Sequence, residues 1–435
     1  MPPLATEKLT RNADAYETFH SEGRSLRVMF ENDRLTEIRQ GENSGLAIRA
    51  VKHGKIGFSY SSKQDEVEAV AEAALRMTPF GKSYDFQFAS PAKSPHVSVF
   101  DERCGKLDAE KLVLLCGAVK DAIKSIAPDA TAECSLGGGI GRTRILTSTG
   151  QECVENESSY GWFVSAKISE EGNFLSTYRM RSGNRMIPDA EVLQGAREAA
   201  QEYLVARKPA PLKPGSYPVL FAPSAVSDLL LPIAVSINGL NIAKKTSPFV
   251  EGLGQKLFDQ RLTILDDPFH EEGPSGGLYD GEGIVTQKRP IVENGVLKSF
   301  VHSLSTAKQA GHAPTGNAAR SVSSLPMPGT HNVIMSPGTD DLDALYQRAN
   351  GGLCIAQLIG TFTSNFLAGQ VSGNVSLGYL VQDGRRVGRV KNCALNVNAF
   401  DVLKSRILGI SKQREWVGSE LLPWVLVDGV QISAR

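Results

Sequence analysis

The sequence predicts an α+β protein with two domains, and three observations lead to this fold class. In the first half, segments in which every second residue is apolar are followed by segments with helical spacing. The segment RKPAPLKPGSYP at 207–218 holds four prolines, which disfavour both helix and sheet, and is the best linker candidate. Beyond it, Asn-Gly and Asp-Gly pairs between apolar runs indicate hairpins. We therefore expect an N-terminal domain of antiparallel strands with packed helices over 1–208, and a β-rich C-terminal domain over 209–435.

The first 60 residues are expected to form three antiparallel strands. Apolar residues at every second position mark strands near 26–30, 46–50 and 56–60. The polar stretches ENDR, GENSG (41–45) and KHGK lie between or beside these strands and are interpreted as turns. Because short turns join antiparallel neighbours, the domain should begin as a small antiparallel sheet.

Three helices are expected in the first domain. Apolar residues recur with helical spacing over 67–74, 112–126 and 189–206. Cys116 on the second of these helices is interpreted as a small core residue, because buried thiols are common and inert. Strands resume near 130–181, between the second and third helices.

The second domain is expected to be mostly β. An Asn-Gly pair between two apolar runs is the strongest short-range hairpin signal, and Asp-Gly acts in the same way. Such turns are expected at 294–295, 383–384 and 428–429. Helices are expected near 224–237, 340–349 and 399–408.

Composition narrows the classes of function. The 47 Lys and Arg residues equal the 47 Asp and Glu residues, and no basic run stands out, so nucleic acid and anionic membrane are poor partners. No segment approaches the roughly 20 apolar residues of a membrane span, and the N-terminal residues lack the apolar core of a signal peptide. The six cysteines are scattered without C-x-x-C spacing, which argues against a zinc ribbon or a disulfide framework. We expect a soluble, reduced protein of the cytoplasm.

Common motifs of nucleotide binding and of serine hydrolases are not found. The glycine run GGGIG at 137–141 lacks the Lys-Ser/Thr of a phosphate-binding loop and precedes no periodic helix. We interpret it as a turn between strands. No G-x-S-x-G nucleophile elbow occurs in the chain.

The pair His270-Glu271 begins like the zinc-peptidase motif H-E-x-x-H, which needs two histidines four residues apart on one helix. The residue four after His270 is Pro274, and the stretch DDPFHEEGPSGG contains two prolines and three glycines. Such a stretch cannot form the helix, so we interpret it as a solvated acidic loop.

A long irregular segment follows in the second half. HAPTGNAARS at 312–321 and SLPMPGTHNVIMSPG at 324–338 combine prolines and glycines with Thr and Asn. Long ordered loops in compact domains are often functional. The alternative is that this segment is only a crossover between sheets.

The second half resembles a known family. GQKLFDQRLTILDDP, DGEGIVTQKRPIVENGVLKSFVHSLSTAKQAGHAPTGNAAR, LPMPGTHNVIMSPG and LVDGVQI, in this order, are similar to the TldD/PmbA family, historically called modulators of DNA gyrase. NDRLTEIRQGENSGLAIRAV at 32–51 agrees with this resemblance. It implies an α+β N-terminal domain and a barrel-like C-terminal domain.

The resemblance also implies where zinc would bind. In the TldD branch a helix carries H-E-x-x-x-H, and its two histidines and a later Cys hold the metal. The matching helix here lies within 224–241, and the motif falls on Leu231, Pro232 and, at its last position, Ser236. Zinc prefers imidazole ligands and a carboxylate to activate its water, and these side chains supply neither. The chain therefore resembles the PmbA (TldE) branch, which lacks the motif.

By the same resemblance, this chain is expected to be the non-metal subunit of a heterodimeric peptidase. Zinc is expected in the TldD-like partner, and no cofactor is expected in this chain. Its roles would be to stabilise the partner and to guide an unfolded or precursor peptide. Thr315, Gly316, Asn317 and Arg320 are candidates to line the peptide path, because glycine permits close approach and Asn or Arg can pair with carbonyl groups. The alternative is that they only brace the fold or the subunit interface.

Two other functions stay open at this point. The chain could be a stand-alone hydrolase with non-metal chemistry, or a purely structural interaction subunit. Whether it forms a homodimer without its partner is also open. The historical family name suggests a link to DNA, but the balanced charge gives no physical support for direct DNA binding.

Overall fold

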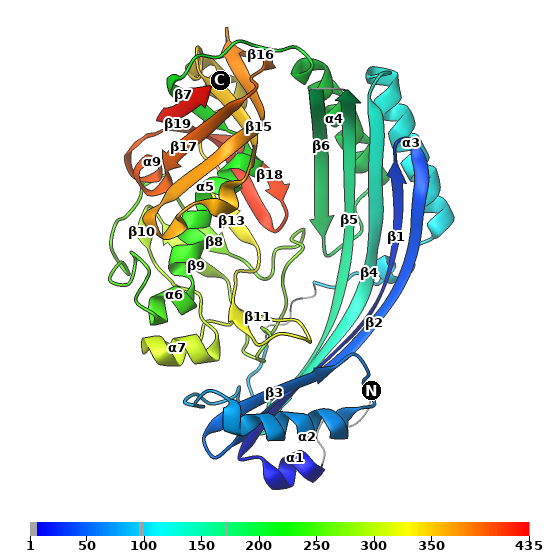
Figure 1. The fold of residues 1–435 in the computed structure, drawn as a ribbon, viewed down its shortest axis with the longest axis vertical. Coiled ribbons are helices and arrows are strands. Elements are labelled where there is room, and N and C mark those ends of the chain that lie inside the picture. The colour runs from blue at the N-terminus through cyan, green and yellow to red at the C-terminus, as the bar shows by residue number, and fades with distance from the viewer. Residues whose placement is uncertain (1–6, 95–96, 98, 171–172, 435) are drawn as a thin grey trace.

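The computed structural model describes residues 7–94, 97, 99–170 and 173–434. A tall sheet formed by the first half stands beside a compact assembly of shorter elements formed by the second half (Figure 1). Helices and strands both contribute, and part of the second half closes into a barrel, so the predicted α+β class with a barrel-like second part is confirmed.

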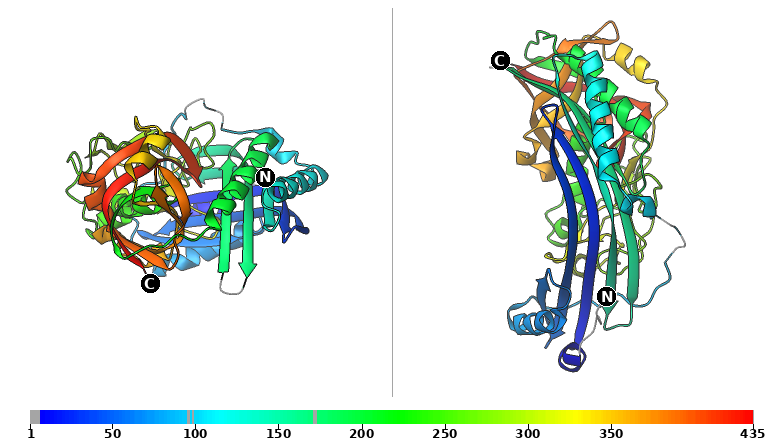
Figure 2. Two further views of the ribbon diagram at one scale, coloured as in Figure 1. Left: turned by 90° about the horizontal axis from the view of Figure 1, so that it is seen from above. Right: turned by 90° about the vertical axis from the view of Figure 1, so that its right-hand side faces the viewer.

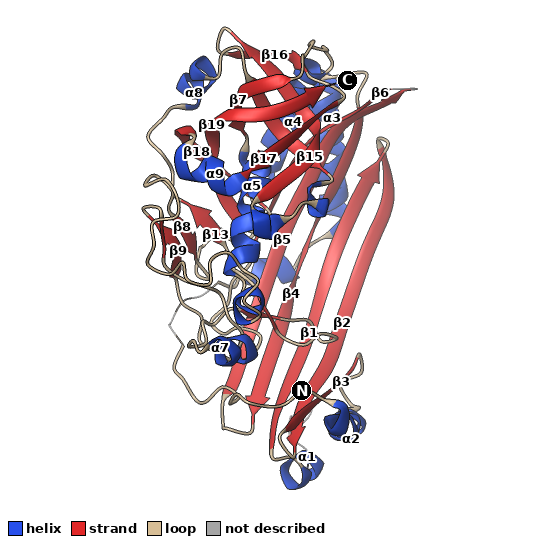
Figure 3. Cartoon of the chain, turned by 60° about the vertical axis from the view of Figure 1, so that its left-hand side comes forward, coloured by secondary structure: helices blue, strands red, loops and turns tan. Residues whose placement is uncertain are grey.

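The first half is built on one antiparallel sheet of six strands in the order β3-β2-β1-β4-β5-β6. Its strands are β1 (Ala15–Glu31), β2 (Arg34–Lys52), β3 (Lys55–Ser61), β4 (Thr131–Thr147), β5 (Glu152–Glu170) and β6 (Asn173–Gly183). Four of them exceed 15 residues and curve along their length (Figure 3). ENDR and KHGK form the turns on either side of β2, as predicted.

Two predicted turns in this sheet are wrong, and both contain glycines that allow close packing. GENSG (41–45) lies within β2, and a β carbon on Gly45 would lie 2.7 Å from the side chain of Val322. GGGIG (137–141) lies within β4, where a β carbon on Gly138 would lie 2.2 Å from the Ser159 carbonyl oxygen of β5. Glycine in a strand interior often marks such an approach of another backbone or loop.

Helices cover one face of this sheet, and the predicted helices of the first half are confirmed. They are α2 (Val67–Met77), α3 (Ala109–Ile126) and α4 (Asp189–Ala206), preceded by a short α1 (Glu7–Asn12). Side chains alternate between faces along a strand. On β5, Trp162 and Val164 share an apolar core with α3 and α4, whereas the odd-numbered Cys153, Glu155 and Glu157 face the other side.

A closed barrel dominates the second half. Its five strands are β7 (Gly215–Phe221), β14 (Leu353–Ile359), β15 (Gln370–Gln382), β17 (Cys393–Asn398) and β19 (Glu420–Ala434). Pairing of β19 with β7 closes the ring. Apolar residues of α5 (Pro223–Ile237) belong to the same core as the strands, so this helix is part of the packing of the barrel.

Shorter elements complete the second half. The strands are β8 (Ile264–Asp266), β9 (Arg289–Glu293), β10 (Val296–Leu297), β11 (Ala318–Ala319), β12 (Met327–Pro328), β13 (Val333–Met335), β16 (Arg385–Arg389) and β18 (Ile407–Val417). The α-helices are α6 (Gly239–Ala243), α7 (Leu304–Ala310), α8 (Leu342–Arg348) and α9 (Ala399–Ser405). Short 3₁₀ turns lie at Thr78–Phe80, Glu102–Gly105, Thr361–Thr363 and Phe366–Ala368.

Two of the three predicted hairpin turns of the second half are confirmed. Residues 294–295 join β9 to β10 and residues 383–384 join β15 to β16, each with both residues at positive φ. The turn at 428–429 is wrong, because these residues lie within β19. Its pairing with β7 shifts register between Val427 and Val430, so the Asp-Gly pair forms a bulge instead of a hairpin.

The two halves are packed together. The connection 207–214 is held to the barrel by a bridge between Pro209 and Arg389. Beside it, the Glu202 carboxylate of α4 accepts hydrogen bonds from the Tyr379 hydroxyl, at 3.0 Å, and from Arg386, at 2.8 Å. The domain boundary at 208/209 stays a prediction. No helix in the described part of the chain is long and apolar enough to cross a membrane.

Candidate functional site

A cleft of about 610 Å³ lies where loops of the second half meet the helix-free face of the long sheet. In Figure 1 the lower part of the sheet bends beneath these loops. One wall comes from β1, β4 and β5, including Phe19, Ser21 and Glu155. The other wall comes from 275–281 and 317–323, joined by 329–331.

The cleft continues along the sheet as a groove. A second hollow of about 440 Å³ adjoins the cleft and shares Ser21, Asn43 and Glu157 with it. Its lining also includes Gly23 of β1 and Gly141 of β4. A groove of this form suits an extended chain better than a compact ligand.

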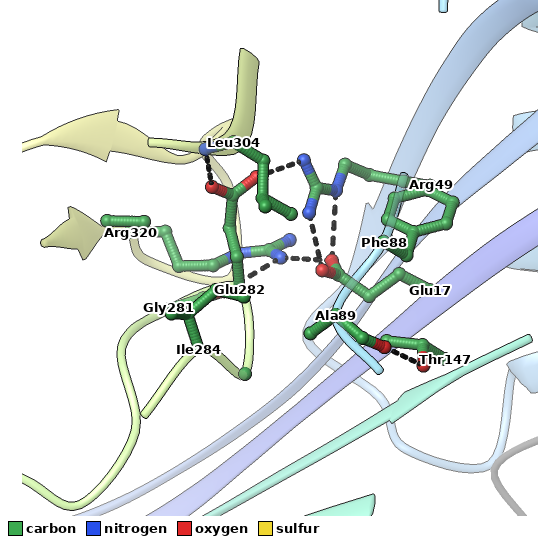
Figure 4. Close-up of polar contacts among 12 residues, drawn as sticks. Glu17, Arg49, Phe88, Ala89, Thr147, Gly281, Glu282, Ile284, Leu304 and Arg320 are labelled. Atoms are coloured by element: carbon green, nitrogen blue, oxygen red, sulfur yellow. Dashed lines mark hydrogen bonds and ion pairs between the residues drawn. The ribbon is translucent and has the colours of Figure 1, made fainter. Parts of the chain in front are cut away.

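A buried ion-pair network joins the two walls of the cleft (Figure 4). Arg49 of β2 donates to Glu17 of β1, with 2.9 Å from Nε to Oε1, and its Nη1 donates to Glu282 at 2.8 Å. Arg320 donates to the same Glu17 carboxylate. Glu282 also accepts the backbone N–H of Leu304 at the start of α7. All four charged side chains are 3% exposed or less, so the junction of the two halves is fixed by paired charges inside the protein.

The partners hold these groups in their charged forms against the cost of burial. Burial alone would raise the pKa of Glu17, but Arg49 and Arg320 hold it below its usual value. Burial would lower the pKa of Arg49, but Glu17 and Glu282 raise it above its usual value. The pKa of Arg320 is lowered, first by burial and also by Arg49, although Glu17 opposes the shift. Its guanidinium carbon lies 4.5 Å from the centre of the Phe19 ring.

A histidine–carboxylate pair lies on the loop wall. The fully buried Asp266 at the end of β8 accepts the backbone N–H of His331 at 2.7 Å, and its Oδ2 lies 3.1 Å from His331 Nδ1. Asn317 donates to the same Oδ2 at 2.6 Å and to the Gly329 carbonyl at 3.1 Å. The His331 side chain is 14% exposed and lines the cleft. Within the described residues its Nε2 has no hydrogen bond.

Glu155 lies on the sheet wall of the cleft, and His331 lies on the loop wall. Oε1 of Glu155 accepts the backbone N–H of Leu278. The pKa of Glu155 is raised to about 7, mainly by burial, and Glu157 adds to the shift. Asp280, on the loop wall, also has its pKa raised to about 7, mainly by burial and then by the charge of Glu282. The cleft therefore holds two carboxyl groups that change charge near neutral pH.

The four residues predicted to line a peptide path are placed differently by the structure. Asn317 and Arg320 lie in the cleft wall, but the guanidinium of Arg320 is turned to Glu17, and its side chain is 1% exposed. Thr315 lies behind the wall, where its hydroxyl bonds to the backbone of His302. Gly316 has φ +72°, and a β carbon there would lie 2.6 Å from the Val285 carbonyl oxygen. Their contact with a peptide stays a prediction.

The helix that matches the family's metal motif offers no ligands for zinc. Leu231, Pro232 and Ser236 lie on α5, and the buried Ser236 hydroxyl has no hydrogen-bond partner among the described residues. Around them the helix presents apolar side chains to the barrel core. Over the described residues, no three His, Cys, Asp or Glu side chains are grouped to hold a metal ion. Zinc does not fit these residues.

The loop with His270 is not helical, as predicted. Glu271 and Glu272 are exposed, which agrees with an acidic loop in solvent. His270 is not fully solvated, because its ring lies edge-on to Trp416 with centres 5.0 Å apart, and its Nδ1 accepts the N–H of Glu272 at 3.3 Å.

Sequence reasoning missed most of the charged groups of the cleft. His331 lies in the irregular segment 324–338, but no metal-ligand spacing marks it in the sequence. Its partner Asp266 is 65 residues away in the chain, and Glu17 is 303 residues from Arg320. Glu155 is one of several acidic residues on an alternating strand, with no local signal that separates it from the others.

Two parts of the chain match models of one protein family. Residues 214–434 match the family described as PmbA/TldA metallopeptidase C-terminal domain, and residues 16–78 match PmbA/TldA metallopeptidase domain 1. An uncharacterized protein of Methanocaldococcus jannaschii is 28% identical over 92% of both chains. A metalloprotease of Methanothermobacter thermautotrophicus is 23% identical over 88% of this chain and 85% of its own. The crystal structure of TldE from Thermococcus kodakarensis has the same fold, with a TM-score of 0.90 and 19% identity over 98% of both chains.

Proposed function

The chain belongs to the PmbA/TldD family of metallopeptidases, and we propose that it is the subunit without catalytic metal in a two-subunit peptidase of this family. A TldD-like partner would supply the zinc and the hydrolysis. This chain would stabilise that partner in the cytoplasm and hold an unfolded or precursor peptide beside it.

One observation carries this proposal. On α5, the helix that the resemblance matches to the metal helix, the motif positions are Leu231, Pro232 and Ser236. An aliphatic side chain, a proline ring and a buried hydroxyl cannot replace imidazole as a zinc ligand or a carboxylate as the base for zinc-bound water. Hydrolysis by the family's chemistry must then come from another subunit.

The cleft and its groove support the proposed contact with peptide. Together they form an open path across β1, β4 and β5. These interior strands are paired on both sides, so a peptide in the path would contact their side chains and the loop wall and would not add a strand to the sheet. Asn317, at the loop wall, is the predicted residue best placed to contact this chain.

The test is metal analysis and a peptidase assay with the protein alone and then mixed with a zinc-bearing homologue. We expect far less than one zinc per chain and no cleavage of an unfolded substrate such as denatured casein by the protein alone. The mixture should form a stable heterodimer and cleave casein in a chelator-sensitive reaction. Cleavage by the protein alone in the presence of chelator would overturn the proposal and favour a stand-alone hydrolase with non-metal chemistry.

A further inference from the structure

The side chains that line the cleft include the carboxylates of Glu155, Glu157 and Asp280 and the imidazole of His331. We propose that His331, with Asp266 as its positioning residue, and Glu155 bind the free amino group of a peptide that lies in the cleft. This inference rests on the proposed peptide path and adds the chemical group that the path recognises.

The geometry of His331 leaves a lone pair available to the ligand. Its Nδ1 lies 3.1 Å from Oδ2 of the fully buried Asp266, and the same carboxylate accepts the His331 backbone N–H at 2.7 Å. A carboxylate beside one ring nitrogen favours the proton on that nitrogen. Nε2 is then an acceptor, and within the described residues it makes no hydrogen bond. Because His331 lines the cleft, this acceptor can reach a bound ligand.

The opposite wall adds a second acceptor. The Glu155 carboxylate uses Oε1 to accept the Leu278 N–H, and the backbone N–H of Tyr279 is a second donor to it. Its remaining lone pairs can accept from a ligand. Glu155 and His331 line the sheet wall and the loop wall of the same cleft, so one ligand in the cleft can meet both. Burial without a cationic partner raises the pKa of Glu155 to about 7. A bound ammonium group would supply that missing cation.

The cations of the cleft wall have their charges paired inside the protein. Arg320 donates to Glu17, and Arg49 donates to both Glu17 and Glu282. The Nε and Nη2 atoms of Arg320 have no acceptor among the described residues, but both are shielded from solvent. Arg289, behind the wall, donates to the Thr315 carbonyl at 3.1 Å. A peptide carboxylate would therefore meet Glu155 and the lone pair of His331 without a cation to receive it. An α-amino group, which is largely protonated at pH 7, offers three donors and a positive charge.

Calorimetric titration of the full-length protein with two peptides tests this inference. The probes are tetra-alanine amide with a free amino terminus and the same peptide with an acetylated amino terminus. At pH 7 the free amine should bind roughly tenfold more tightly, or more, because it gains charge-assisted hydrogen bonds that the acetylated peptide cannot make. Glu155→Gln and His331→Gln should each remove most of this preference, and Asp266→Asn should reduce it.

Matched variants outside the cleft serve as controls. Glu152→Gln changes an exposed carboxylate on the same strand as Glu155, and His312→Gln changes an exposed imidazole from the irregular segment. Both should keep the full preference for the free amine. Glu155→Gln retains an acceptor for the Leu278 N–H, and circular dichroism checks that each variant is folded.

Two results would overturn the inference. Equal binding of the two peptides by the unmodified protein rejects amine recognition while leaving the proposed peptide path in place. A preference that survives in both Glu155→Gln and His331→Gln rejects these residues as its source. Absence of binding by either peptide would reject the peptide path itself, and the amine site with it.

Discussion

Helix α5 in the barrel and the cleft beside the long sheet are both places where catalysis or binding is expected, but their side chains differ in kind. At the motif positions of α5 the chain has apolar side chains and one buried hydroxyl, and the helix contributes to the packed core. At the cleft, two halves of the molecule bring together paired and unpaired charges with little exposure to solvent. The comparison indicates that α5 has a role in packing, whereas the polar chemistry of this chain lies at the junction of its halves.

The largest expected effect comes from breaking the ion-pair network at that junction. Arg49→Ala leaves Glu17 and Glu282 buried, with Arg320 as the sole cation of the network. Removing one partner from a buried ion pair costs about 3–5 kcal/mol. We expect the free energy of unfolding in urea to fall by about 4 kcal/mol. Arg39→Ala, which removes an exposed ion pair with Glu37, should cost less than about 1 kcal/mol.

A loss below about 1 kcal/mol for Arg49→Ala would mean that the network contributes little to stability. The junction would then be held mainly by apolar contacts, and the contrast between the cleft and α5 would weaken. Arg49→Lys refines the result, because lysine keeps the charge but cannot bridge two carboxylates with a planar fork.

A cavity in α5 should have a slightly smaller effect on stability and none on the cleft. Ile233 is 2% exposed and packs in the barrel core. Truncating a buried isoleucine to alanine typically costs 2–5 kcal/mol, so we expect a loss of about 3 kcal/mol for Ile233→Ala in urea unfolding. Ala234→Ser on the exposed side of the same helix serves as the control.

Peptide binding completes this test. Because Ile233 lies in the barrel core, the folded Ile233→Ala protein should bind the tetra-alanine probes as the unmodified protein does. Loss of binding without loss of stability would contradict a packing role for α5.

The third prediction concerns the pH dependence of stability, and the expected change in unfolding free energy is smaller. The pKa of Glu155 is about 7 in the folded protein, mainly because of burial, and returns to its usual value of about 4.5 on unfolding. Between these values the folded state binds more protons than the unfolded state, so this group makes the protein less stable as pH rises from about 4.5 to about 7. The lowered pKa of Glu17 has the opposite effect at lower pH, where it makes the protein more stable as pH rises.

Comparison of Glu155→Gln with the unmodified protein isolates this contribution. Relative to the unmodified protein, the variant should gain stability between pH 5 and pH 7, by on the order of 2 kcal/mol. Urea unfolding at several pH values provides the measurement. The exposed substitution Glu152→Gln should leave the pH dependence unchanged, and equal pH dependence in all three proteins would show that Glu155 is not desolvated.

The sequence predicted the regular elements where one local pattern decides the structure. Strict alternation identified the strands on either side of the turns at ENDR and KHGK, and helical spacing identified α2, α3 and α4. Asn294-Gly295 formed its hairpin because the flanking strands pair with each other. The same kind of signal failed at Gly138 and Gly429, which lie within paired strands. Gly138 allows close packing against β5, and Gly429 forms part of a bulge in β19.

The cleft could be predicted only in part, for a related reason. The irregular segment around Asn317 and His331 was visible as a candidate because it has no regular pattern. Its electrostatic partners were not, since Asp266 and Glu17 come from distant elements that meet only in the fold. Burial, which raises the pKa of Glu155 and Asp280, is likewise a property of the packed molecule.

The smallest expected effect on stability is that of Asn317→Ala. The same variant distinguishes a residue that contacts the peptide from one that only supports the fold. The Asn317 side chain donates to Asp266 and to the Gly329 carbonyl, so its loss should cost about 1–2 kcal/mol of unfolding free energy. If Asn317 also contacts substrate, peptide hydrolysis by the complex with a zinc-bearing partner should slow several-fold while the affinity between subunits is unchanged. Asn374→Ala, which changes an exposed asparagine on β15, should alter neither stability nor hydrolysis. Unchanged hydrolysis with Asn317→Ala would favour a structural role, because stability would then be the only property that depends on this side chain.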